Sequence, residues 1–211
     1  MERVLCLVMG YVFGLFQTGY LYSRSKHMDI RNYGSGNSGS TNVLRVMGKK
    51  AGLIVFLGDA GKMIAACLIT RVLFRSQPEL LYVYLLYTGF GVILGHNFPF
   101  YMGFKGGKGI AASAGLLVST DWRVMLVCLV VFVAAVAITR YVSLGSILVM
   151  ICFFIGMVFF GARGDFGIGV AHLTEFYVLA GLISAMGIWR HHTNIKRLLS
   201  GTENKLGARK E

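Results

Sequence analysis

Charged residues are scarce in this sequence. Only 14% of its 211 residues are charged, whereas 55% are hydrophobic and the mean hydropathy is +0.66. Soluble domains carry about 25% charged residues, so the composition excludes an ordinary soluble domain and predicts a protein that crosses a membrane several times. Little of the chain is left outside the bilayer, and we therefore expect one domain over residues 1–211.

Cysteine and acidic residues are also few. The four cysteines lie inside apolar runs without C-x-x-C spacing, and the five histidines do not recur at ligand spacings with carboxylates. This pattern gives no support to a disulfide framework, a metal site or a cofactor. Nine acidic residues face 21 basic ones, for a net charge of +12. The basic residues cluster in short polar segments, which predicts contact with anionic membrane lipid and no nucleic acid as partner.

Seven apolar runs follow one another along the chain. They cover residues 4–22, 52–74, 80–94, 110–120, 124–139, 144–162 and 173–189. The first is too long for the core of a signal peptide and lacks a clear A-x-A cleavage site, so we expect a spanning helix there. The run at 110–120 has only eleven residues, too few for a straight crossing, and is either a short crossing or a re-entrant half-helix.

Charge distribution favours the short crossing. If all seven runs cross and the N-terminus is outside, the basic segments at 23–50, 105–108, 140 and 190–210 all face the cytoplasm. A re-entrant run at 110–120 would put the six basic residues of the C-terminal tail outside, against the positive-inside rule. The sequence therefore predicts an all-α membrane protein, a compact bundle of seven transmembrane helices, one of them short, with a cytoplasm-facing active site.

The second run contains two ionisable residues, Asp59 and Lys62. Residues three apart share a helix face and can pair, and ions in a membrane segment point inward because burial against lipid is costly. We expect a structural ion pair here in preference to direct catalysis.

A glycine-rich segment at 95–109 lies where the third run ends and the short run begins. Glycines let the backbone approach a ligand, successive amides can form an anion-binding nest, and Lys105 and Lys108 add positive charge. The segment lacks the G-x-x-x-x-G-K-[ST] spacing of a P-loop. It predicts a phosphate site, with a basic turn beside a membrane helix as the alternative.

With the seven-helix topology, three polar segments meet on one face of the membrane. Together they offer Ser35, Asn37, Thr41, Asn42, Arg45, His96, Lys105, Lys108, His191, His192 and Asn194. Arginine and lysine suit phosphate oxygens, so this set predicts an anion site reached by a phosphorylated substrate from the cytoplasm and a lipid-like substrate from the bilayer. The sequence contains no G-x-S-x-G elbow, the motif that would indicate a covalent acyl-enzyme.

Three motifs carry a resemblance to a known family. They are Gly34-Ser35-Gly36-Asn37 through Thr41-Asn42-Val43-Leu44-Arg45, Gly95-His96 with Phe104-Lys105-Gly106-Gly107-Lys108-Gly109, and His191-x-x-Asn194-Ile195-x-Arg197-Leu198. In this order they resemble the motifs of the bacterial acyl-phosphate-dependent glycerol-3-phosphate acyltransferases, the PlsY family. Ser38 and Ser40 stand where the family commonly has proline and alanine, and both are small enough to keep the loop's shape.

The resemblance implies a reaction and a place in the cell. An acyl group would move from acyl phosphate to the 1-hydroxyl of glycerol 3-phosphate, giving lysophosphatidic acid and phosphate without acyl-CoA, as the first acylation step of phospholipid synthesis. The enzyme would be a multi-pass protein of the bacterial inner membrane. Acyl phosphate is a mixed anhydride with a good leaving group, so the site has mainly to position two anions and offset their repulsion.

The resemblance also implies roles for single residues. Ser35, Arg45 and Lys105, with Lys108, would bind substrate phosphate; amides at Gly36, Gly106, Gly107 and Gly109 would hold the acyl phosphate; and His96, Ser143, His191 and Asn194 would orient glycerol 3-phosphate. Asn37 and Asn42 complete the substrate-binding set, and Glu203 would hold the C-terminal segment. An orienting role for His96 is favoured over that of general base, because the sequence supplies no carboxylate beside it.

Two other classes of protein stay open from the residues alone. A phosphate-ester transporter would also use basic groups near helix breaks, but no internal repeat of the kind typical of transporters is found. A non-catalytic membrane scaffold would not need three glycine-and-cation loops on one face.

Overall fold

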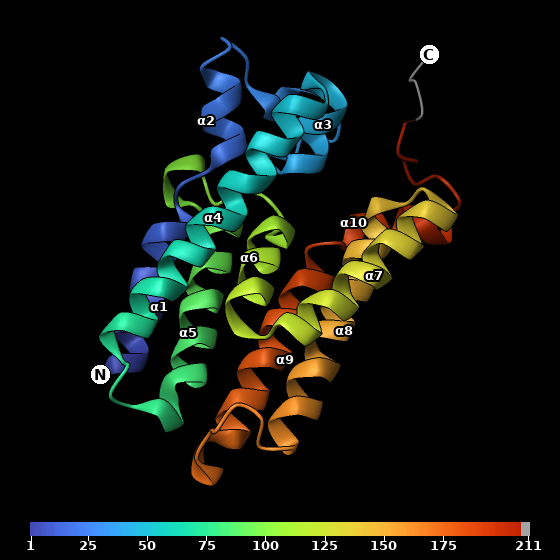
Figure 1. Cartoon of the computed structure of the whole chain (residues 1–211). Helices are drawn as coiled ribbons and strands as arrows, with labels where there is room; N and C mark the ends of the chain where they lie inside the picture. The colour runs from blue at the N-terminus through green and yellow to red at the C-terminus, as the bar shows by residue number, and fades with distance from the viewer. Residues whose placement is uncertain (208–211) are drawn as a thin grey trace.

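The structure, a computed structural model, describes residues 1–207, and the regular elements of that part are all helical (Figure 1). They are α1 (Glu2–Gly14), α2 (Thr18–Arg24), η1 (Ile30–Asn32), α3 (Ser40–Met47), α4 (Lys49–Leu73), α5 (Pro78–Asn97), η2 (Phe100–Met102), α6 (Ile110–Thr120), α7 (Trp122–Thr139), α8 (Val142–Ala162), η3 (Val170–His172), α9 (Leu173–Trp189) and α10 (His192–Leu199). Arg209 and Lys210, two of the tail cations in the charge argument, lie outside the described residues.

Six segments of the described chain are long and apolar enough to cross a membrane, and α6 is a shorter apolar helix. Eleven residues make α6 about 16 Å long. Its first residues adjoin the end of α5, while at its other end the carbonyl of Ser119 accepts a hydrogen bond from Arg71 of α4 at 2.6 Å. Arg123, at the start of α7, pairs with Asp165 beyond α8 at 2.7 Å. The short helix therefore joins opposite ends of the bundle, and the prediction of seven helical segments is confirmed.

The first apolar run is not one continuous helix, contrary to the sequence prediction. It divides into α1 and α2 at residues 15–17, with neither glycine nor proline at the break. The side-chain amide of Gln17 donates to the carbonyls of Gly14, Gly95 and His96 at 3.0–3.4 Å, and Lys62 donates to the carbonyl of Phe16 at 2.6 Å. Because tertiary partners satisfy the freed backbone groups, the chain can open here without losing hydrogen bonds.

Glycines bring α1 and α5 into backbone contact. A Cβ on Gly10 would lie 2.2 Å from the carbonyl oxygen of Thr88, and one on Gly91 would lie 2.2 Å from that of Leu7. Small residues at such positions let membrane helices approach closely. This packing sets the end of α5, and with it His96, beside the break between α1 and α2.

The core joins α4, α5, α6, α8 and α9, and α7 contributes Val124 and Cys128 to it. Core side chains include Met63, Leu86, Leu116, Phe153 and Phe176. On α7 the outer face is apolar and exposed, as for Val130 and Ile138, which suits a surface that meets lipid tails. Figure 1 shows α6 between the group of α1, α4 and α5 on one side and α7, α8 and α9 on the other.

Candidate active site

A cavity of about 120 Å³ lies where the three motif segments meet. Ten of the fourteen predicted site residues line it: Ser35, Asn37, Asn42, Arg45, His96, Lys108, Gly109, Ser143, His191 and Asn194. Four do not: Gly36, Lys105, Gly106 and Gly107. The wall has an apolar side formed by Phe56, Ile110, Phe132 and Val142. The cavity therefore combines a basic, polar end with an apolar one.

Asn42 organises the first motif rather than presenting free groups. Its side-chain oxygen accepts from the amide of Ser35 at 2.8 Å, and its side-chain nitrogen donates to the carbonyls of Ile30, Tyr33 and Asn37 at 2.9–3.3 Å. With these contacts and 2% exposure, it is buried within the loop that it closes. Ser35 is thereby held at the rim of the cavity with an exposed side chain.

The pair Gly106 and Gly107 packs against the end of α5. Their amides donate to the carbonyls of Asn97 and His96, both at 3.1 Å, and their carbonyls accept from Arg190 at 3.2 and 2.7 Å. A Cβ on Gly107 would lie 2.0 Å from His96 Nε2. Neither amide is a free donor for an anion, contrary to the expectation above, and the glycines instead make room for the imidazole.

The amide of Gly36 is likewise engaged, with the carbonyl of Tyr33 at 3.0 Å. Gly109 differs, because its amide donates no hydrogen bond to another residue of the described chain. Its backbone is left-handed, with φ +81°, and it begins α6, whose first amides have no partner within the helix. Ile110 and Ala111 line the cavity beside it, so the start of α6 offers amide donors and a positive helix end.

A chain of polar contacts joins the second and third motifs. Lys108 donates to the side-chain oxygen of Asn194, whose nitrogen donates to Glu203 at 2.8 Å. Ser143 donates to the same carboxylate oxygen at 3.0 Å, and Arg197 pairs with the other at 2.7 Å. Burial, reinforced by the neighbouring Arg197, lowers the pKa of Lys108 to about 8.

The imidazole of His191 is oriented by its own helix. His191 Nδ1 lies 2.7 Å from the carbonyl oxygen of Gly187, which can only accept, so Nδ1 carries the proton. Burial lowers the pKa of His191 to about 4, and the ring is neutral at pH 7. Its Nε2 is therefore an acceptor in a residue that lines the cavity.

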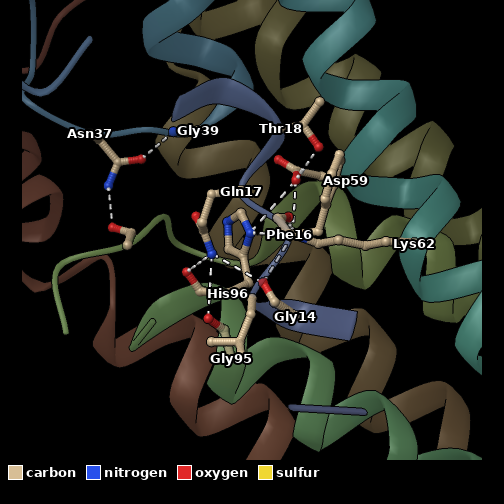
Figure 2. Close-up of polar contacts among 12 residues, drawn as sticks. Gly14, Phe16, Gln17, Thr18, Asn37, Gly39, Asp59, Lys62, Gly95 and His96 are labelled. Atoms are coloured by element: carbon tan, nitrogen blue, oxygen red, sulfur yellow. Dashed lines mark hydrogen bonds and ion pairs between the residues drawn. The ribbon is translucent and has the colours of Figure 1, made fainter. Parts of the chain in front are cut away.

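His96 has a carboxylate near it after all. Asp59 Oδ1 lies 3.7 Å from His96 Nδ1, and Lys62 Nζ lies between them, 3.0 Å from Asp59 and 2.9 Å from His96 (Figure 2). The predicted Asp59–Lys62 pair is confirmed, and the statement that His96 lacks a neighbouring carboxylate is wrong. The sequence could not reveal this contact, because the two residues lie 37 positions apart on different helices.

Arg45 and Lys105 differ in their relation to the cavity. Arg45 lines the cavity from α3 and donates to the carbonyl of Asn204 at 3.3 Å, which ties it to the C-terminal segment. Lys105 is exposed and stands outside the cavity lining. Of the two lysines in the glycine-rich segment, Lys108 is thus the one within the cavity wall.

Sequence reasoning missed two residues that shape the site. Arg190 holds the glycine pair through its carbonyls, and its only sequence signal is its position directly before His191. Asn97 is fully buried at the end of α5, its side-chain amide has no partner within residues 1–207, and a Cβ on Gly109 would lie 3.2 Å from its oxygen. The signal for Asn97 is a polar residue in the last turn of a membrane helix.

Comparison with known proteins agrees with this arrangement. Residues 4–201 match the family model for glycerol-3-phosphate acyltransferase. The chain is 41% identical over 211 residues to the glycerol-3-phosphate acyltransferase of Clostridioides difficile (strain 630), covering 99% of this chain and 97% of that protein. It is 36% identical over 213 residues to that of Thermoanaerobacter sp. (strain X514), covering 100% and 99%.

Solved structures match over nearly the whole chain. The crystal structure of PlsY (YgiH), an integral membrane glycerol 3-phosphate acyltransferase, in its glycerol 3-phosphate form superposes with a TM-score of 0.83 at 35% identity, covering 98% of this chain and 96% of that one. The lysophosphatidic acid form gives 0.81 at 33% identity. The family model, the relatives and the shared fold together establish that this chain belongs to the glycerol-3-phosphate acyltransferase family.

Proposed function

We propose that this protein transfers an acyl group from acyl phosphate to the 1-hydroxyl of glycerol 3-phosphate, giving lysophosphatidic acid and inorganic phosphate. The observation that carries the proposal is the convergence of three distant segments, through Arg45, Lys108 and His191, on one cavity with an apolar side. Relatives of the family are described as glycerol-3-phosphate acyltransferases, and the related structures hold the proposed acceptor and product.

Electrostatics would do most of the catalytic work. Two phosphate-bearing reactants repel each other, and the cavity offers the Arg45 guanidinium, the Lys108 ammonium and the amides at the start of α6 to offset that repulsion. Fixed donors in a site with little water stabilise developing negative charge strongly. The apolar wall formed by Phe56, Phe132 and neighbouring side chains would receive the start of the acyl chain from the bilayer.

The chemistry then needs one addition and one elimination. The 1-hydroxyl oxygen of glycerol 3-phosphate attacks the acyl carbon, and the carbon–oxygen bond to the phosphate breaks as the carbonyl reforms. Phosphate leaves with the bonding electron pair and takes up the hydroxyl proton. His191 Nε2, an acceptor on the cavity wall, is suited to orient that hydroxyl through its hydrogen. No acyl-enzyme is formed in this series of reaction steps, and no cofactor is used.

The whole chain would act as one membrane domain whose active site faces the cytoplasm. The basic segments at 23–50 and 190–207 lie at the same end of the bundle as the cavity, which supports this orientation in a bacterial inner membrane through the positive-inside rule. Acyl phosphate and membrane lipid would reach the site from the bilayer, and glycerol 3-phosphate from the aqueous side.

A donor assay tests the proposal. The purified protein in lipid nanodiscs is supplied with glycerol 3-phosphate and either palmitoyl phosphate or palmitoyl-CoA, and lysophosphatidic acid is measured. We expect product from palmitoyl phosphate alone, with one phosphate released per product. Product from palmitoyl-CoA alone, or none from either donor in a protein that still binds glycerol 3-phosphate, would overturn the proposal.

A further inference from the structure

A buried cluster of charge lies next to the cavity at the break between α1 and α2. Lys62 Nζ contacts Asp59 Oδ1 at 3.0 Å, the carbonyl of Phe16 at 2.6 Å and His96 Nδ1 at 2.9 Å (Figure 2). The carbonyl of Gly14 is farther, at 3.4 Å. The side chains of Lys62 and His96 are each 4% exposed, and that of Asp59 is 0% exposed. All three side chains are therefore almost fully buried.

The contacts of Lys62 Nζ relate its protonation state to the tautomer of His96. An ammonium has three N–H donors and no acceptor, and its three nearest partners are a carboxylate, a carbonyl and an imidazole nitrogen. The first two can only accept. When Lys62 is charged, its third N–H is directed at His96 Nδ1, 2.9 Å away, so that Nδ1 has the lone pair and the ring proton is on Nε2. A neutral Lys62 would instead accept a hydrogen bond from Nδ1–H.

Asp59 favours the charged form of Lys62 at this depth. A lone ammonium buried among helices would lose its proton, whereas a hydrogen-bonded pair retains its charge. Asp59 Oδ1 also accepts from Thr18 at 2.9 Å, which fixes the carboxylate at the start of α2. With Lys62 charged, the carbonyl of Phe16, Asp59 Oδ1 and His96 Nδ1 each accept one N–H from it.

His96 also lines the cavity, and its Nε2 lies beside Gly107. A Cβ added to Gly107 would be 2.0 Å from Nε2. Within residues 1–207, Nε2 makes no hydrogen bond of its own. We propose that Lys62, held by Asp59, is a positioning residue that fixes His96 as the Nε2–H tautomer, so that His96 donates a hydrogen bond to an oxygen of the bound substrate anion.

In this proposal, one of the two cavity histidines accepts a hydrogen bond from the substrate and the other donates one. His191 is protonated on Nδ1 by its contact with the carbonyl of Gly187 and presents an acceptor; His96 receives on Nδ1 from Lys62 and presents a donor. A hydroxyl and a phosphate or acyl oxygen need these two different partners. The use of the His96 donor rests on the proposed function, whereas the tautomer itself does not.

Nitrogen NMR tests the tautomer directly. Protein labelled with ¹⁵N-histidine is placed in nanodiscs at pH 7.5 without substrate, and His96 is assigned from the signal lost in His96→Gln. We expect Nε2 protonated and Nδ1 unprotonated in the wild-type protein. A proton on His96 Nδ1, donated to a neutral Lys62, would overturn the proposal. This measurement needs no variant of Lys62, so it decides the matter even where such variants fold poorly.

Variants then test the role of Lys62. In Lys62→Met, the nearest partner of His96 Nδ1 is Asp59, so the ring proton should move to Nδ1 and kcat should fall by about 100-fold, as for the loss of one donor to developing charge. Lys62→Arg, which keeps an N–H donor, should restore the Nε2–H signature and part of kcat. An unchanged tautomer in Lys62→Met would contradict the proposal.

Thr70→Val is the matched control. Thr70 is fully buried on the same helix and bonds to Thr88 at 2.7 Å, away from the site. Its loss should leave both the His96 tautomer and kcat unchanged, and a shift as large as that of Lys62→Met would assign the effect to general loosening of α4. If the tautomer is as expected and acyl phosphate is not a donor, the proposed function fails while the assignment of Lys62 stands.

Discussion

Ser143 Oγ donates a hydrogen bond to Glu203 Oε1 at 3.0 Å, across 60 residues of sequence. The contact joins the start of α8 to the segment that follows α10. Glu203 also accepts from Asn194 and pairs with Arg197. The Glu203 carboxylate thus holds Asn194 and Arg197 of the third motif in place. Through Asn194 it also positions Lys108.

Replacing this carboxylate should loosen the site and the fold. In Glu203→Ala, Ser143, Asn194 and Arg197 lose their shared acceptor, and we expect the free energy of unfolding to fall by about 2–3 kcal/mol because a buried pair is broken on one side. Activity should fall with it. Thermal unfolding in detergent and initial rates measure the two effects.

Glu203→Gln is the matched control for shape. The amide oxygen still accepts from Ser143 and Asn194 but no longer pairs with Arg197, so stability and activity should lie between those of the wild type and Glu203→Ala. Equal behaviour of all three proteins would show that Glu203 does not hold the segment.

The pH dependence of anion binding should reflect Lys108. Its pKa in the folded protein is lowered to about 8, mainly by burial, from the usual value of about 10.4. The charged form is present below pH 8 and is lost as the pH rises through that value. We therefore expect kcat/KM for acyl phosphate to fall about tenfold for each pH unit above the pKa of the free enzyme.

Lys108→Arg separates this group from others that titrate in the same range. A guanidinium stays charged at every pH of the assay, so the alkaline fall should disappear in the variant, even where its rate at pH 7 is lower. Spontaneous hydrolysis of acyl phosphate is measured at each pH and subtracted. The same fall in both proteins would remove Lys108 as its cause.

Gly107 should tolerate no side chain. A methyl group there would lie 2.0 Å from His96 Nε2, so the imidazole would have to move by about 1 Å, a displacement that can cost about 100-fold in rate. We expect Gly107→Ala to lose activity by about that factor. Gly61→Ala, where an added Cβ meets no atom within 4 Å, should be as active as the wild type. Full activity in Gly107→Ala would contradict the packing described here.

Labelling of single cysteines should report the orientation. In a background without the four native cysteines, Lys26→Cys and Thr202→Cys should react from the cytoplasmic side, and Ser76→Cys from the opposite side; all three positions are exposed. Reaction of residues 26 and 202 from opposite sides would contradict the seven-crossing topology.

The helices could largely be predicted from hydropathy, and the break in the first of them could not. Residues 110–120 coincide with α6, because a left-handed glycine and the capping residue Asp121 bound it. The break at residues 15–17 is set by Gln17 and Lys62, which bond to carbonyls freed from α1. Gln17 lies in the break itself, but Lys62 and the carbonyls of Gly95 and His96 that Gln17 bonds lie on other helices, so the local sequence does not determine the break.

The residues that form the site could be predicted better than the hydrogen bonds and ion pairs between them. The resemblance to the family implied fourteen site residues, ten of which line the cavity. It could not reveal that the amides of Gly106 and Gly107 are bonded to α5 or that Asp59 and Lys62 reach His96. Both depend on how far α5 extends and on its close packing against α1, which are tertiary properties.

The most direct test of the account is a map of this protein with both anions bound. The ligands are glycerol 3-phosphate and an acyl-phosphate analogue in which CH₂ replaces the bridging oxygen. The account predicts two phosphate-like densities in the cavity, one or both within hydrogen-bonding distance of Arg45 and Lys108, with the glycerol hydroxyl near His191 Nε2. Density for either anion outside this cavity, at full occupancy of both, would contradict it.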